Sequence, residues 1–405
     1  MSASSEPNAD LTPLDLPRGG LPEVTNADIA NAVAQLRAGT GAFAVDTERA
    51  MGIRYSNRAY LVQVRRPGAG TFLIDPIGIE DKLTELREVM QAEWILHAAD
   101  QDLPCLHELG LYPEKVFDTE LAGLILGFEH VSLQAMVADL LGWELAKEHS
   151  TADWSQRPLG PELRAYAALD VELLHELKEV LVAKLIAAGR LEWLEQECEA
   201  VRLSKPAPPP KQPWRRAARQ AGIRDTRALA MVRELWRVRD ELAQQRDLAP
   251  GRVLPNKVLA ELAARKPRSR ADVARSSLLR SRERRQDANN WWRAIDIAWR
   301  LDERALPARR FQESTALFPP VNRWERHDED AAARWAALRT AIFGLADELG
   351  IRQDILLKPA IQRHVAWFGW SSRADLAEKL AEQGARPWQI EQVSGVLDSA
   401  VRASK

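Results

Sequence analysis

The stretch FAVDTE, residues 43–48, combines a short apolar run with two carboxylates. An aromatic residue, an alanine and a β-branched residue in succession predict a buried β-strand. Asp46 and Glu48 are two positions apart, so their side chains point to one face of that strand, and Thr47 points to the other. Carboxylates beside a buried run are costly unless a partner replaces their lost hydration. The stretch therefore predicts a sheet that carries a metal site.

Two further segments of the N-terminal half place acids beside apolar runs. Asp102 follows the strand-like run EWILHAA, residues 93–99, and opens a predicted helix. Tyr166 and Asp170 are four residues apart on another predicted helix, so they share a face. Carboxylates without histidine or thiolate ligands select hard cations such as Mg²⁺ or Mn²⁺, and two such ions can hydrolyse a phosphodiester. For each acid taken alone, solvation or an ion pair at the surface is the alternative.

The order of predicted elements favours an α/β domain followed by helices. Runs at 41–48, 59–66 and 71–76 predict a β-meander, and further strands are predicted at 93–99 and 115–120. The helices predicted from apolar periodicity cover 80–92, 102–109, 119–127, 131–141, 161–188 and 190–202. Beyond these, the pattern is helical to the C-terminus.

Composition divides the chain into five segments. A Pro- and Ser-rich N-terminus predicts a disordered tail, and five prolines between residues 204 and 216 predict a semi-rigid linker. We expect a tail at 1–22, an α/β domain at 23–203, a linker at 204–218, and two all-α domains at 219–308 and 309–405.

Charge is distributed very unevenly along the chain. Residues 1–203 hold 17 Lys and Arg against 33 Asp and Glu, whereas residues 204–310 hold 27 against 12. A strongly basic segment predicts contact with nucleic acid, and a solvated helical surface is the alternative. Five positions are predicted to contact the backbone of a nucleic acid: Arg265, Lys266, Arg268, Arg270 and Arg282.

Several classes of protein are disfavoured. Two isolated cysteines, Cys105 and Cys198, argue against a disulfide framework and a cysteine-based metal site. The N-terminus lacks the basic and apolar regions of a secretory signal, and no apolar run approaches the roughly 20 residues of a membrane span. We expect a cytoplasmic protein without membrane contact, and no obligatory protein partner is evident.

The acidic motifs occur along the chain in the same order as the motifs of a known enzyme family, which they resemble. D-x-E at 46–48, H-x-x-x-x-D-L at 97–103 and Y-x-x-x-D at 166–170 are similar to the tyrosine-type DEDD 3′–5′ exonucleases, and to the ribonuclease D family in particular. The segments VFDTELAG (116–123) and ADWSQRPL (152–159) resemble that family too. The resemblance implies a ribonuclease H-like exonuclease domain with a mixed sheet flanked by helices. It further implies that Asp46, Glu48, Asp102 and Asp170 bind two divalent cations, and that Tyr166 orients the attacking water.

The basic segment carries a second resemblance. Residues 227–269 look like the helical domain shared by RecQ-type helicases and ribonuclease D, called HRDC, and a divergent HRDC-like domain would account for the C-terminal segment. Together the resemblances imply a 3′–5′ exoribonuclease that releases nucleoside 5′-monophosphates from precursors of tRNA or other structured RNAs. Trp154 and Arg157 are candidates for stacking on a base and binding a phosphate, and a packed loop is the alternative.

Two other functions stay open on the sequence. The same site would serve an exonuclease that acts on DNA, although no G-x-x-x-x-G-K-[ST] motif of a fused helicase is present. A catalytically inactive RNA-binding protein is the second alternative, which the complete set of five motif residues disfavours.

Overall fold

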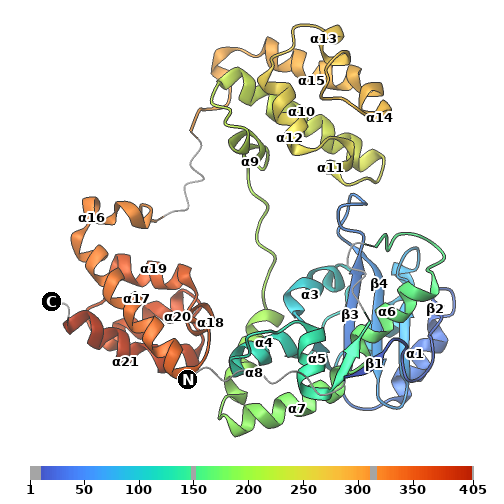
Figure 1. Cartoon of the computed structure of the whole chain (residues 1–405), viewed down its shortest axis with the longest axis vertical. Helices are drawn as coiled ribbons and strands as arrows, with labels where there is room; N and C mark the ends of the chain where they lie inside the picture. The colour runs from blue at the N-terminus through green and yellow to red at the C-terminus, as the bar shows by residue number, and fades with distance from the viewer. Residues whose placement is uncertain (1–10, 147–151, 311–316, 404–405) are drawn as a thin grey trace. The chain divides into compact units, whose positions relative to one another are not determined.

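The computed structural model describes residues 11–146, 152–310 and 317–403 (Figure 1). The chain forms two compact units. Unit 1 comprises residues 1–48, 59–205 and 317–405, and unit 2 comprises residues 49–58 and 206–316. The N-terminal α/β domain and the C-terminal helices therefore belong to the same unit.

A mixed six-stranded sheet forms the centre of the α/β domain. The strand order is β2 (Val24–Thr25), β5 (Gly70–Ile74), β4 (Ala59–Arg66), β3 (Phe43–Arg49), β6 (Glu93–Leu96) and β7 (Lys115–Asp118). β4 and β5 are antiparallel, as a meander requires, and β3, β6 and β7 run parallel. The predicted fold class, a mixed sheet flanked by helices, is confirmed.

The helices of this domain differ from the predicted ranges, notably at Leu173 and at the start of α3. They are α1 (Ile29–Ala38), α2 (Thr84–Val89), α3 (Ala99–Glu108), α4 (Thr119–Leu126), α5 (Leu133–Leu141), α6 (Pro161–Glu172), α7 (Leu174–Ala187) and α8 (Leu191–Arg202). The helix predicted at 161–188 is divided at Leu173, whose backbone leaves the helical region. Helix α3 begins before Asp102, because the Asp118 carboxylate accepts hydrogen bonds from the amides of Ala98 and Ala99.

The prediction of a disordered tail at 1–22 is wrong for residues 11–22, and residues 1–10 lie outside the described residues. Strand β1 (Thr12–Leu14) pairs in parallel with β8 (Trp143–Leu145), and Leu14 is buried. Arg18 then forms ion pairs with Glu172 and Glu176. Backbone pairing and these ion pairs order a segment whose polar composition favoured disorder.

The described part of unit 2 is mainly helical, with irregular segments at 50–58, 206–213 and 301–310. Its helices are α9 (Trp214–Gln220), α10 (Thr226–Gln245), α11 (Pro250–Val253), α12 (Asn256–Ala264), α13 (Arg270–Ala274), α14 (Arg282–Gln286) and α15 (Ala288–Arg300). Asp225 caps α10 by accepting a hydrogen bond from the amide of Ala228. Trp291 of α15 is wholly buried in the core of this unit.

The C-terminal helices form a separate core and dock on the α/β domain. They are α16 (Trp324–His327), α17 (Glu329–Leu349), α18 (Gln353–Leu356), α19 (Pro359–Phe368), α20 (Arg373–Glu382) and α21 (Pro387–Ala403). Trp388 of α21 stacks on Trp193 of α8, with ring centroids 4.5 Å apart. Within the described parts of the chain, none of the helices has the length and apolar character needed to span a membrane.

Candidate active site

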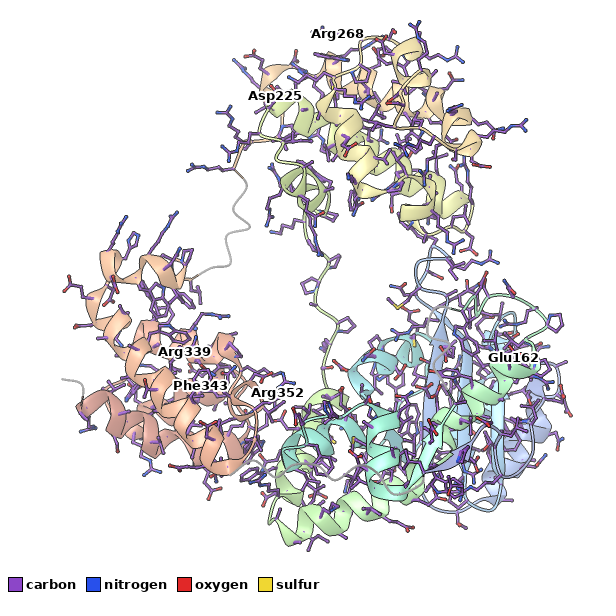
Figure 2. All side chains as sticks on the ribbon, in the orientation of Figure 1. Glu162, Asp225, Arg268, Arg339, Phe343 and Arg352 are labelled. Carbon is purple, nitrogen blue, oxygen red and sulfur yellow. The ribbon has the colours of Figure 1, made fainter. Side chains whose placement is uncertain are left out.

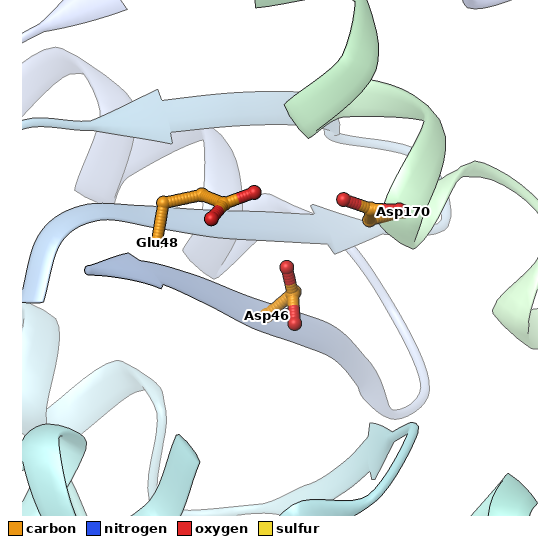
Figure 3. Close-up of side chains that lie close together, drawn as sticks. All are labelled: Asp46, Glu48 and Asp170. Atoms are coloured by element: carbon orange, nitrogen blue, oxygen red, sulfur yellow. The ribbon is translucent and has the colours of Figure 1, made fainter. Parts of the chain in front are cut away.

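Three of the predicted carboxylates converge on one face of the sheet. Asp46 and Glu48 extend from β3, and Asp170 extends from α6, which packs against β4 and β5 (Figure 3). Each offers one oxygen atom, and these atoms all lie within 4.8 Å of one another. All three side chains are half-buried. Burial and the negative charges of Asp102, Asp170 and Glu48 raise the pKa of Asp46 well above its ordinary value.

Asp102 lies near this cluster but is held differently. Its side chain is buried in the first turn of α3, and its Oδ1 accepts a hydrogen bond from Thr47 Oγ1 at 2.7 Å. Thr47 points away from the cluster face, as strand alternation predicts. Asp102 is outside the group within 4.8 Å, yet its charge is the largest neighbouring influence on the pKa of Asp46. Asp102 is therefore close enough to interact electrostatically with the other three carboxylates.

Tyr166 lies on α6, the helix that also carries Asp170. The helix begins at Pro161, a favourable first helical residue, and Tyr166 precedes Asp170 by about one turn. The Tyr166 ring lies 6.1 Å from the ring of Trp154, centroid to centroid. This placement is consistent with the prediction that Tyr166 and Asp170 share one face of a helix.

Gln63 is a residue of the site that the sequence analysis missed. It is wholly buried on β4, and its Nε2 donates a hydrogen bond to Asp46 Oδ2 at 3.2 Å. A polar residue within the apolar run AYLVQVRR was the only available signal. The strand order explains this polar residue, because β4 lies beside β3, the strand that carries Asp46.

Asp118 and His97 support the strand ends around the site. The buried carboxylate of Asp118 accepts hydrogen bonds from the amides of Ala98, Ala99, Glu120 and Leu121, and so joins the starts of α3 and α4. His97 Nδ1 lies 2.9 Å from Thr119 Oγ1, and burial lowers the pKa of His97 to about 4. His97 is therefore neutral at physiological pH and has a structural hydrogen bond.

For Trp154 and Arg157 the structure supports the alternative of a packed loop. Trp154 is wholly buried, so its faces are covered by protein. Arg157 pairs with Asp75 at 2.5 Å and donates to the carbonyls of Tyr60 and Trp154 at 2.7 and 2.8 Å. These bonds fix the segment that precedes α6. Trp154 has no face available for a base in this structure, whereas Arg157 is bound by protein groups but keeps 31% of its side chain exposed.

The predicted basic contacts divide into two groups. Arg265, Lys266 and Arg268 line a pocket of about 500 Å³ that also contains Arg275, Ser276 and Ser277. Arg268, visible in Figure 2, stacks its guanidinium over the Trp299 ring at 4.2 Å, and Lys266 pairs with Asp225 at 2.8 Å. Arg270 and Arg282 are exposed at the starts of α13 and α14, and they are not among the lining residues.

Family comparisons cover most of the chain. Residues 23–186 match the 3′–5′ exonuclease family, and residues 228–295 match the HRDC domain. Residues 318–401 match the 3′ to 5′ exonuclease C-terminal domain. The expected second helical domain is present, but the family that it matches is this C-terminal domain rather than HRDC.

Similar proteins extend the comparison to the whole length. The chain is 31% identical to ribonuclease D of Pseudomonas paraeruginosa over 77% of this chain and 82% of the relative. It is 34% identical to ribonuclease D of Jannaschia sp. over 58% of this chain and 63% of the relative. Among solved structures, Escherichia coli RNase D has a TM-score of 0.65 at 25% identity, covering 94% of this chain and 99% of that protein. A protein from Bifidobacterium adolescentis has a TM-score of 0.87 at 33% identity, covering 97% and 100%. The chain therefore belongs to the ribonuclease D family of 3′–5′ exoribonucleases.

Proposed function

We propose that Asp46, Glu48, Asp102 and Asp170 bind two divalent cations, Mg²⁺ or Mn²⁺, and that this site removes nucleotides from the 3′ end of RNA. The observation that carries the proposal is the group of three carboxylate oxygens within 4.8 Å on one face of the sheet. Their mutual repulsion, which contributes to the raised pKa of Asp46, is what a bound cation would offset. An all-carboxylate donor set fits a hard cation.

The roles of the chain's own residues follow from their placement. When bound, such cations lower the pKa of a water molecule and stabilise the leaving oxygen of the phosphodiester. Asp46, Glu48 and Asp170 would hold the cations on the sheet, and Asp102 would complete the site from α3. Tyr166, one turn before Asp170 on α6, would orient the attacking water through its hydroxyl group. Each cycle would release a nucleoside 5′-monophosphate.

We further propose that the substrates are tRNA precursors or other structured RNAs in the cytoplasm. The similar structure of Escherichia coli RNase D is described as an exoribonuclease involved in structured RNA processing. The excess of basic residues between 204 and 310 supplies the attraction for phosphates that the acidic N-terminal half lacks. The pocket lined by Arg265, Lys266, Arg268 and Arg275 is our candidate for a backbone contact. We retain residue 203 as the end of the exonuclease domain and residue 309 as the start of the second helical domain. We begin the exonuclease domain at or before residue 11, because β1 and Arg18 pair with it, and the first helical domain at Trp214, which is buried in its core.

The test is digestion of a 5′-labelled single-stranded RNA by the full chain, with a DNA of matched sequence in parallel. With Mg²⁺ or Mn²⁺ we expect a ladder shortened from the 3′ end and release of nucleoside 5′-monophosphates. Asp46→Asn removes one charge from the site and is expected to lower the rate by at least about 100-fold. Faster digestion of the DNA would contradict the assignment of substrate. Unchanged activity of Asp46→Asn would contradict the assignment of the site.

A further inference from the structure

A buried glutamine lies directly beside the carboxylate cluster. Gln63 has no exposed surface, and its Nε2 lies 3.2 Å from Asp46 Oδ2. We propose that Gln63 is a positioning residue, whose amide group fixes the orientation of the Asp46 carboxylate for cation binding. The inference rests on the proposed function of the cluster and assigns to it a residue outside the acidic motifs.

The sheet directs Gln63 to the face that carries the site. Arg65, two residues further along β4, points to the same face and pairs with Glu172 of α6 at 3.2 Å. Asp170 lies on that same helix, close to Asp46 and Glu48. Gln63 is therefore placed beneath the cluster, on the strand next to the one that carries Asp46.

The hydrogen bond has a defined direction. An ionised carboxylate only accepts hydrogen bonds, so it is the NH₂ group of Gln63 that must face Asp46. One oxygen of Asp46 is then engaged, and rotation of its carboxylate is restricted. The lone pairs that remain point in a fixed direction, which is what a ligand to a small divalent cation requires.

The oxygen of the Gln63 amide indicates that this residue is not there to stabilise the fold. Its Oε1 is buried and has no hydrogen-bond partner among the described residues. A buried polar atom without a partner destabilises the fold, and an apolar side chain of similar length would fill the same space without that penalty. Residues that weaken the fold in this way are concentrated at functional sites.

The test compares Gln63→Met with a matched variant of the full chain. Methionine keeps the length and the apolar contacts of the side chain but has no donor for Asp46. Titration calorimetry with MnCl₂, in the absence of RNA, is expected to show about tenfold weaker binding. The thermal midpoint should be unchanged or higher, because the unpartnered oxygen is removed. In activity assays the loss should be recovered by excess Mn²⁺, with the KM for RNA unchanged.

Gln362→Met is the control. Gln362 is also buried, but it lies in the C-terminal domain, where its Nε2 donates to the carbonyl of Leu357 at 2.6 Å. This substitution should lower the thermal midpoint and leave Mn²⁺ binding unchanged. If Gln63→Met fails to fold, Gln63→Asn replaces it, since its amide is one methylene too short to reach Asp46. That variant should also show weaker Mn²⁺ binding.

The outcomes separate this inference from the proposed function. If the unaltered chain binds no Mn²⁺, the proposed metal site itself is wrong. If the unaltered chain binds Mn²⁺ and a folded Gln63 variant binds it equally well, the metal site stands and the positioning role is refuted. A fall in thermal midpoint with unchanged Mn²⁺ affinity would make Gln63 a structural residue only.

Discussion

The contact between α8 and α21 offers a quantitative prediction about how the C-terminal domain is held. Glu197 accepts hydrogen bonds from Arg386 Nη2 at 2.9 Å and from Trp388 Nε1 at 3.1 Å. The side chains of the ion pair are only 14% and 10% exposed, for Arg386 and Glu197 respectively. Glu197→Gln preserves the shape but leaves the Arg386 charge buried without its counterion.

The expected cost follows from that burial. Removing one partner of a buried ion pair destabilises a protein by about 3–5 kcal/mol. Glutamine retains one acceptor oxygen for Trp388 or Arg386, so we expect the lower end, about 3 kcal/mol. Arg386→Met should cost a similar amount, because it leaves the Glu197 charge buried. The double variant should cost no more than either single variant, about 3 kcal/mol instead of the additive sum of about 6 kcal/mol, which corresponds to a coupling free energy of about 3 kcal/mol.

The assay is urea unfolding at pH 7 of the unaltered chain, the two single variants and the double variant, monitored by tryptophan fluorescence. Trp193 and Trp388 stack at this contact, so the fluorescence reports on it. Glu199→Gln is the control: Glu199 pairs with Arg202 three residues away at an exposed position, and its loss should cost under about 1 kcal/mol. Purely additive effects of Glu197→Gln and Arg386→Met would refute the reasoning, because two residues that do not interact have no coupling energy.

Three further predictions concern pH, the site and RNA. The pKa of His97 is lowered to about 4 in the folded protein, whereas it is about 6.5 in the unfolded chain. The stability that the neutral His97 side chain contributes is therefore complete above pH 6.5 and is lost as the pH falls toward 4. His97→Asn should remove about 3 kcal/mol of that acid sensitivity, measured as the difference in free energy of unfolding between pH 7 and pH 4. Thr47→Val deletes the 2.7 Å bond to Asp102 and should reduce kcat more than the KM for RNA; equal changes in both would argue against a role at the site. Arg265→Gln and Arg275→Gln should each lower the slope of log affinity for single-stranded RNA against log salt by about 0.7, and an unchanged slope would exclude a phosphate contact.

The parts of the site that the sequence predicted are those set by local periodicity. Two-residue alternation places Asp46 and Glu48 together, and four-residue spacing places Tyr166 above Asp170. The interactions that the sequence did not predict depend on pairing between distant segments. The bond from Gln63 to Asp46 requires the strand order, since neither residue signals the other along the chain.

Two segments that differ from the expectations drawn from the sequence show the same effect of distant partners. Tryptophan and arginine in the segment ADWSQRPL are typical of an RNA contact, yet Trp154 is buried and Arg157 pairs with Asp75, so both side chains have structural contacts. The polar residues 11–22 are ordered because β8, about 130 residues away, supplies the backbone partner. Composition alone contains no information about such a partner.

The N-terminal segment also affects how the catalytic domain can be produced on its own. The family match begins at residue 23, and a recombinant fragment designed from that limit would lack β1 and Arg18. Such a fragment would leave the edge of β8 without its partner strand, and Glu172, which is wholly buried at the end of α6, would retain only Arg65 as its counterion. A shortened exonuclease that begins at residue 11 or earlier would keep both interactions. An affinity tag is better attached at the C-terminus, away from the N-terminal segment whose Arg18 pairs with Glu172 on the helix of Tyr166 and Asp170.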